Sequence, residues 1–117
     1  MRAAQKSIMK ANRLVIAAAQ MKFRLAIADN VTWITQAIHA AGKAGADAIL
    51  FPECAVTGYH CDFAALSRTQ VETALDSIAR TARAAHCHVL VGSPTFIGRK
   101  RFNSLRVFNR RGQEVFC

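Results

Sequence analysis

Three short apolar runs, separated by two segments with helical periodicity, most strongly constrain the fold of this chain. The runs occupy residues 13–20, 46–53 and 87–92. Continuous apolar runs of this length are typical of strands that are buried on both faces of a parallel sheet. The alternation of strands and helices therefore predicts a layered α/β fold in which right-handed crossovers join parallel strands.

The two intervening segments each carry an apolar stripe at spacings of three and four. In the first segment the stripe consists of Val31, Ile34, Ile38 and Ala41. Asp29 or Asn30 is expected to cap this helix, and Gly45, which accepts the left-handed conformation, is expected to end it. In the second segment the stripe consists of Val71, Leu75, Ile78, Ala82 and Ala85. Thr69 and Glu72 predict a capping box at its start.

The remaining sequence predicts a loop and a C-terminal strand pair. Residues 54–67 show no regular period and predict a loop. Residues 102–108 and 113–117 predict a fourth and a fifth strand, joined by the turn sequence NRRG at 109–112. About five strands with two helices would leave one face of the sheet poorly covered, because each face of a sheet needs a covering layer.

Length and charge narrow the class of protein. The chain has 117 residues, which is typical of one domain, and we interpret residues 1–12 as a basic, flexible N-terminus before a domain at 13–117. Its net charge of +9 invites comparison with nucleic-acid-binding proteins. Aromatic residues do not alternate with the basic ones as single-strand binding requires, which argues against a nucleic-acid partner and leaves a basic nucleic-acid binder as the third interpretation.

Hydropathy and the pattern of cysteines indicate the cellular compartment of the protein. No apolar run approaches the length of a membrane span, so we expect no membrane association. The four cysteines form no C-x-x-C pair, and no secretory signal precedes them. We therefore expect a cytoplasmic protein with free thiols.

Glu53 is the leading candidate for a catalytic residue. It follows the apolar segment AILFP and lies at the carboxyl end of a predicted parallel strand, where functional groups of open α/β sheets gather. A half-buried carboxylate at such a position suits a general base. From position alone, a structural carboxylate that caps a loop or pairs with an arginine fits equally well.

The segment around Glu53 belongs to a set of five motifs. These are RLVIAAAQM at 13–21, DNVTWITQAIHAAGKAGAD at 29–47, GADAILFPECAVTGY at 45–59, VLVGSPTF at 89–96 and RFNSLRVFNRRGQEV at 101–115. In this order they resemble the nitrilase superfamily of carbon–nitrogen hydrolases. The third motif is similar to the superfamily signature, in which Phe-Pro-Glu ends a strand and Gly-Tyr follows. The last is similar to its Asn-Ser hairpin.

The resemblance implies a fold and an activity. It implies a layered α-β-β-α sandwich of the nitrilase type, commonly a homo-oligomer. The implied reaction is hydrolysis of a small-molecule amide, N-carbamoyl compound or nitrile without a metal or organic cofactor. In this family a cysteine attacks the substrate carbon, a glutamate acts as general base and a lysine stabilises the charged intermediate. Glu53 matches the glutamate, and Tyr59 matches the tyrosine of Gly-Tyr and is expected to help shape the substrate pocket.

The family's lysine and cysteine would fall beyond Cys117, so we expect a truncated, incomplete sandwich that is inactive by itself. Cys54 is not expected to replace the nucleophile, because neighbours on an extended strand point to opposite faces and Cys54 adjoins Glu53. Lys100 lies ahead of the family's lysine position. No metal site is expected, since the spacing of the loop residues Cys54, His60, Cys61 and Asp62 fits no zinc pattern.

A non-catalytic domain is the alternative to an enzyme fragment. An incomplete sandwich would expose a large apolar sheet face, and such faces usually mediate association. On this interpretation the chain self-associates or binds a partner protein.

Overall fold

The computed structural model of the chain describes residues 12–117. Its elements, in chain order, are β1 (Ile16–Ala18), α2 (Ile27–Lys43), β2 (Ala48–Leu50), η1 (Phe63–Ala65), α3 (Arg68–Ala85), β3 (His88–Ile97), β4 (Lys100–Phe108) and β5 (Glu114–Phe116). The strands form one five-stranded sheet in the order β1-β2-β3-β4-β5. β1, β2 and β3 run parallel, and β4 and β5 are antiparallel to their neighbours. The predicted α/β class is confirmed. Apart from Asn12, the predicted flexible N-terminus lies outside the described residues.

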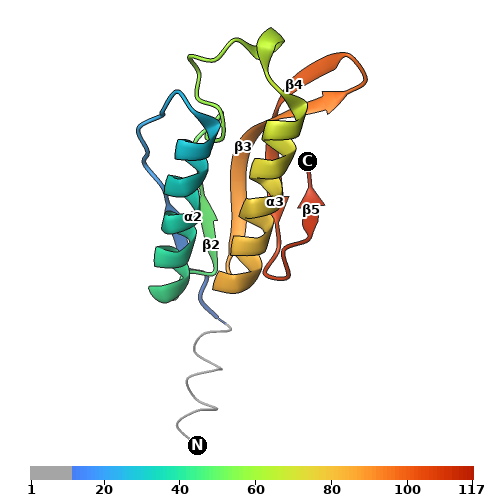
Figure 1. Cartoon of the computed structure of the whole chain (residues 1–117). Helices are drawn as coiled ribbons and strands as arrows, with labels where there is room; N and C mark the ends of the chain where they lie inside the picture. The colour runs from blue at the N-terminus through green and yellow to red at the C-terminus, as the bar shows by residue number, and fades with distance from the viewer. Residues whose placement is uncertain (1–11) are drawn as a thin grey trace, which may run out of the picture.

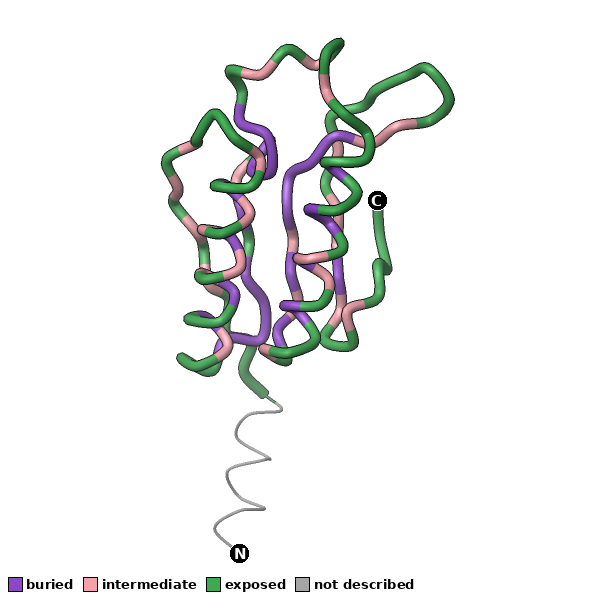
Figure 2. The backbone as a smooth tube through the Cα atoms, in the orientation of Figure 1, coloured by how far each residue is buried: buried purple, intermediate pink, exposed green. Residues whose placement is uncertain are grey.

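The two long helices lie side by side on one face of the sheet (Figure 1). The core fills the space between them and the strands, and Figure 2 shows that the buried backbone follows β2, β3 and the turn after β2. Fully buried core side chains come from both helices and from β3, among them Ile34, Ile38, Ile78, Val89 and Val91. The helical stripes read from the sequence therefore face the sheet. Neither long helix is apolar enough over its length to cross a lipid bilayer.

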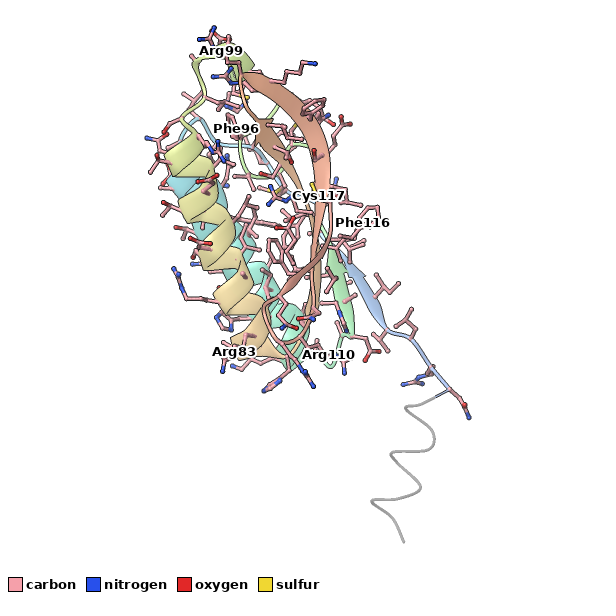
Figure 3. All side chains as sticks on the ribbon, turned by 90° about the vertical axis from the view of Figure 1, so that its right-hand side faces the viewer. Arg83, Phe96, Arg99, Arg110, Phe116 and Cys117 are labelled. Atoms are coloured by element: carbon pink, nitrogen blue, oxygen red, sulfur yellow. The ribbon has the colours of Figure 1, made fainter. Side chains whose placement is uncertain are left out.

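The opposite face of the sheet carries no helix in the described part of the chain. Cross-strand partners share a face, and the register joins Leu50, Leu90, Val107 and Phe116 into one apolar row across four strands. Leu50 is 43% exposed and Phe116 is 62% exposed. Figure 3 shows Phe116 pointing away from the helices. We call this surface the open face.

The open face also explains one wrong prediction. The first apolar run was expected to be a strand buried on both faces, but β1 comprises three residues and Ile16 is exposed. β1 is an edge strand, and its pairing with β2 places Ile16 opposite Ala48. Ala17 points to the helices and packs against the core, whereas Ile16 points to the open face.

Helix α2 begins earlier than its predicted caps. Ala26 is its N-cap residue, and no side chain caps the helix there. Asn30 lies within the first turn and is fully buried. Its side-chain oxygen accepts a hydrogen bond from the Arg24 backbone N–H (2.8 Å), and its amide donates to the carbonyls of Arg24 (3.0 Å) and Val56 (3.2 Å). Asn30 thus joins two loops instead of capping its own helix. The helix ends near the predicted Gly45, whose φ is +83°.

Helix α3 also begins earlier than predicted. Ser67 is its N-cap residue and accepts a hydrogen bond from the Gln70 backbone N–H at 3.3 Å. The predicted capping box is wrong, because Ser67 is an equally good cap two residues before Thr69. Glu72 instead forms an exposed ion pair with Arg68 at 2.8 Å.

Two ion pairs connect the strand ends. Asp47, just before β2, accepts hydrogen bonds from the Val15 backbone N–H (2.9 Å) and from Arg110 Nη2 (2.6 Å). It thereby joins β1 to the β4–β5 turn. Arg106 binds both carboxylate oxygens of Glu114, at 2.5 and 2.8 Å. This two-point contact, of a kind that is stronger than a single bond, attaches the short strand β5 to β4.

Candidate active site

The candidate site lies where the chain leaves β2. The last ladder contact of this segment is the hydrogen bond from the Phe51 N–H to the Leu90 carbonyl (2.8 Å), and the chain then turns. Cys54 adopts a φ of +55°, which is uncommon for a residue other than glycine. Its carbonyl accepts hydrogen bonds from the N–H groups of Thr57 (3.2 Å) and Gly58 (2.6 Å). The turn places Glu53 beyond the carboxyl end of β2.

The turn packs directly against Gly92 of β3. The Val56 N–H donates to the Gly92 carbonyl at 3.2 Å. A Cβ atom on Gly92 would lie 2.5 Å from the Cys54 nitrogen and 2.6 Å from the Pro52 carbonyl oxygen. Both contacts are with backbone atoms, so neither could be relieved by a side-chain rotation. Only a residue without a side chain lets the Glu53 turn approach β3 this closely.

Two neutral side chains hold the carboxylate of Glu53. The Tyr59 hydroxyl donates to Oε2 at 2.8 Å, and the Asn103 amide Nδ2 donates to Oε1. Tyr59 follows Glu53 in the same loop, whereas Asn103 lies on β4. Each carboxylate oxygen therefore has a donor, and each keeps a lone pair that can accept a further proton or hydrogen bond.

Tyr59 is bound to Glu53 at its hydroxyl and packed at its ring. Its ring meets Phe23 edge-on, with centroids 5.5 Å apart and planes at 74°. The hydrogen bond to Glu53 raises the pKa of Tyr59, and burial and the nearby charge of Glu53 add smaller effects. Ionisation would remove the bond and place two negative charges together. A contact with substrate, expected from the resemblance, remains a prediction for Tyr59.

Cys54 lies beside Glu53 and has the properties of a structural thiol. It is 2% exposed, and its Sγ donates to Asn103 Oδ1 at 3.5 Å. Burial raises the pKa of the Cys54 thiol, and the charge of Glu53 raises it further. A thiol with a raised pKa carries less of the nucleophilic thiolate at neutral pH.

Two geometric expectations for Glu53 are wrong. Glu53 and Cys54 do not alternate on an extended strand, because β2 ends at Leu50 and the turn brings both side chains to Asn103. Glu53 is also exposed, although a half-buried carboxylate was predicted. Asn103, Leu105 and Val107 are spaced by two along β4, so their side chains share one face of the sheet. The contact of Asn103 with Glu53 therefore lies on the open face, which residues 12–117 leave uncovered.

The other candidate residues of the loop have local partners. The Cys61 thiol donates to the Gly58 carbonyl at 3.1 Å, and Asp62 caps η1 by accepting from the Ala64 N–H at 2.9 Å. Within the described residues, no three His, Cys, Asp or Glu side chains are grouped to hold a metal ion. Lys100 lies at the exposed start of β4, next to the hairpin tip.

Asn103 is the site residue that sequence reasoning missed. The signal was present, since Asn103 is the asparagine of the Asn-Ser hairpin motif. That motif indicated a strand pair, and it gave no indication of which residue would face Glu53.

Comparisons with known proteins identify the family and the fold of the chain. The family model described as carbon-nitrogen hydrolase matches residues 15–116. No curated protein sequence matches the chain. Among solved structures, an amidase from Nesterenkonia sp. has a TM-score of 0.78 at 24% identity, and the match covers 88% of this chain and 41% of that one.

Two further solved structures are similar to this chain to the same extent. A variant of the amidase from Nesterenkonia sp. AN1 in complex with butyramide has a TM-score of 0.78 at 25% identity, covering 87% of this chain and 41% of that one. Another variant, described as an amidase from the nitrilase superfamily, has a TM-score of 0.80 at 24% identity. This match covers 88% of this chain and 41% of that one. The chain thus spans about 41% of the length of these structures.

We predict that Glu53→Gln lowers the pKa of Tyr59, because the amide lacks the charge that opposes ionisation of the phenol. The chain contains one tyrosine, so the ultraviolet absorbance of tyrosinate during an alkaline titration reports Tyr59 alone. Glu72→Gln, which removes an exposed carboxylate from α3, is the matched control and should leave the titration unchanged. An unaltered Tyr59 titration in Glu53→Gln would contradict the contact.

Proposed function

Because the chain belongs to the carbon–nitrogen hydrolase family, we propose that it takes part in hydrolysis of a carbon–nitrogen bond, with Glu53 as general base. The observation that carries this proposal is the placement of the Glu53 carboxylate. It lies beyond the carboxyl end of a parallel strand, is held by Tyr59 and Asn103, and retains lone pairs for a proton. The proposed substrates are small amides, N-carbamoyl compounds and nitriles. Binding of butyramide by the similar amidase supports amides among these.

The neutral character of both donors suits a base. A lysine or arginine in direct contact would stabilise the carboxylate and weaken its affinity for a proton. Tyr59 and Asn103 fix the orientation of the carboxylate without adding a positive charge. On this proposal Glu53 accepts the proton of the attacking thiol, and later that of the water that releases the product.

We also propose that the chain is the N-terminal portion of the active domain and does not turn over substrate by itself. The Cys54 thiol bonds to Asn103 and has a raised pKa, which argues against its use as the nucleophile. A positioned base alone accelerates a reaction about 10²–10⁴-fold. Enzymes accelerate reactions at least about 10⁶-fold over the uncatalysed rate. The family's lysine and cysteine would supply the remaining acceleration. The complete enzyme is proposed to be a cytoplasmic homo-oligomer without a metal or organic cofactor.

A hybrid enzyme tests the role of Glu53. Residues 15–116 replace the matching first segment of the Nesterenkonia amidase, which keeps its own remaining sequence. We predict that the hybrid releases ammonia from butyramide and that Glu53→Gln lowers the rate by about 10²-fold or more. Glu72→Gln is the control and should retain activity, with circular dichroism confirming that each variant folds. Undiminished ammonia release from the Glu53→Gln hybrid would contradict the proposal, and turnover by the isolated chain would contradict its inactivity.

Self-association is the second candidate function, and the open face favours it. Leu50, Leu90, Val107 and Phe116 form a continuous apolar row, and exposed rows of this kind commonly mark association surfaces. On this alternative, the chain forms oligomers through the open face and has no catalytic role.

We predict that Leu50→Lys reduces association, because it places a charge in the middle of the apolar row. Sedimentation velocity over a range of concentrations measures the effect. Leu25→Lys is the matched control, since Leu25 is 87% exposed and lies before α2, outside the sheet. A chain that stays monomeric at every concentration would exclude this candidate.

A further inference from the structure

Asn103 contacts two residues of the turn after β2 with the two ends of one amide. Its Nδ2 donates to Glu53 Oε1, and its Oδ1 accepts from Cys54 Sγ at 3.5 Å. These partners fix which way the amide points. A carboxylate can only accept, so it requires the NH₂ group, and a protonated thiol donates to the oxygen. The amide therefore has one orientation that satisfies both neighbours.

Asn103 lies in the longest ladder of the sheet, whereas Tyr59 lies in a loop. β3 and β4 form the longest ladder of the sheet, from the Val89–Phe108 pair to the Ile97–Lys100 pair. Asn103 lies within this ladder, opposite Pro94, which is fully buried. Tyr59, the other donor to Glu53, lies in a loop whose only regular element is the single turn η1. Of the two donors, Asn103 is the one built on a rigid element.

We propose that Asn103 is the positioning residue that orients the Glu53 carboxylate, an inference that rests on the proposed role of Glu53 as general base. By holding Oε1, Asn103 turns Oε2 toward the Tyr59 hydroxyl and keeps the carboxylate at the edge of the sheet. It acts through Glu53 and takes no part in proton transfer. Because Asn103 is exposed, its replacement should cost little stability.

The test measures Tyr59 in the chain itself. Asn103→Ala should lower the pKa of Tyr59 toward its value in Glu53→Gln, because a carboxylate released from Asn103 is no longer held in place for the phenol. In the Glu53→Gln background, Asn103→Ala should produce no further change. Asn103→Ser, whose hydroxyl is too short to reach Glu53, should behave like Asn103→Ala and provides a second variant.

Asn109→Ala is the control for a purely structural asparagine. Asn109 Oδ1 accepts hydrogen bonds from the N–H groups of Arg111 (2.9 Å) and Gln113 (3.0 Å) in the β4–β5 turn. Its replacement should lower the unfolding midpoint in denaturant and leave the Tyr59 titration unchanged. A Tyr59 pKa that does not move in Asn103→Ala, or that moves equally with and without Glu53, would overturn the positioning role.

The hybrid enzyme separates this inference from the proposed function. There, Asn103→Ala should lower kcat for ammonia release about tenfold with little change in KM, since it misorients the base without touching substrate. If Glu53→Gln leaves ammonia release intact, the proposed function fails, whatever the titration shows. If Glu53→Gln abolishes release but Asn103→Ala changes neither kcat nor the Tyr59 pKa, Glu53 remains the base and the role of Asn103 is rejected.

Discussion

The close approach of the Pro52–Cys54 backbone to Gly92 is the constraint on which the candidate site depends. Because Gly92 has no side chain, it leaves room for the turn that follows β2, in which Cys54 has a positive φ. From this turn the side chains of Glu53 and Cys54 both reach Asn103 on β4. Val89 and Val91, buried under the helices, hold the strand that carries Gly92. The position of the carboxylate is thus a consequence of core packing several residues away.

The second organising feature is a core built on one side of the sheet. The helices cover one face of the sheet. The open face carries the apolar row through Leu50 and Phe116, and the Glu53 carboxylate, which was expected to be half-buried, is exposed on the same side. The uncovered face of the sheet therefore explains why both the Glu53 carboxylate and the apolar row are exposed. A second sheet, as in the sandwich that the family resemblance implies, would cover both.

Periodicity in the sequence was enough to predict the order of the helices and strands and the place of Glu53 after β2, because both depend on local patterns. The stripes through Ile34 and Ile78 and the turn at 109–112 appear in the structure as predicted. Two of the missed contacts are non-local. Asn30 bonds to the carbonyl of Val56, 26 residues away, and Asn103 bonds to Glu53, 50 residues away. Which of several good caps is used, and which asparagine faces a carboxylate, cannot be read from spacing alone.

Asn103 and Tyr59 together hold the Glu53 carboxylate. Nuclear Overhauser contacts of the Asn103 side-chain amide protons, measured in the isotopically labelled chain near neutral pH, test it most directly. We expect contacts from these protons to the Glu53 side chain, and one amide proton shifted downfield relative to its position in Glu53→Gln. An Asn103 amide without contacts to Glu53, and with the same chemical shifts in both proteins, would contradict it.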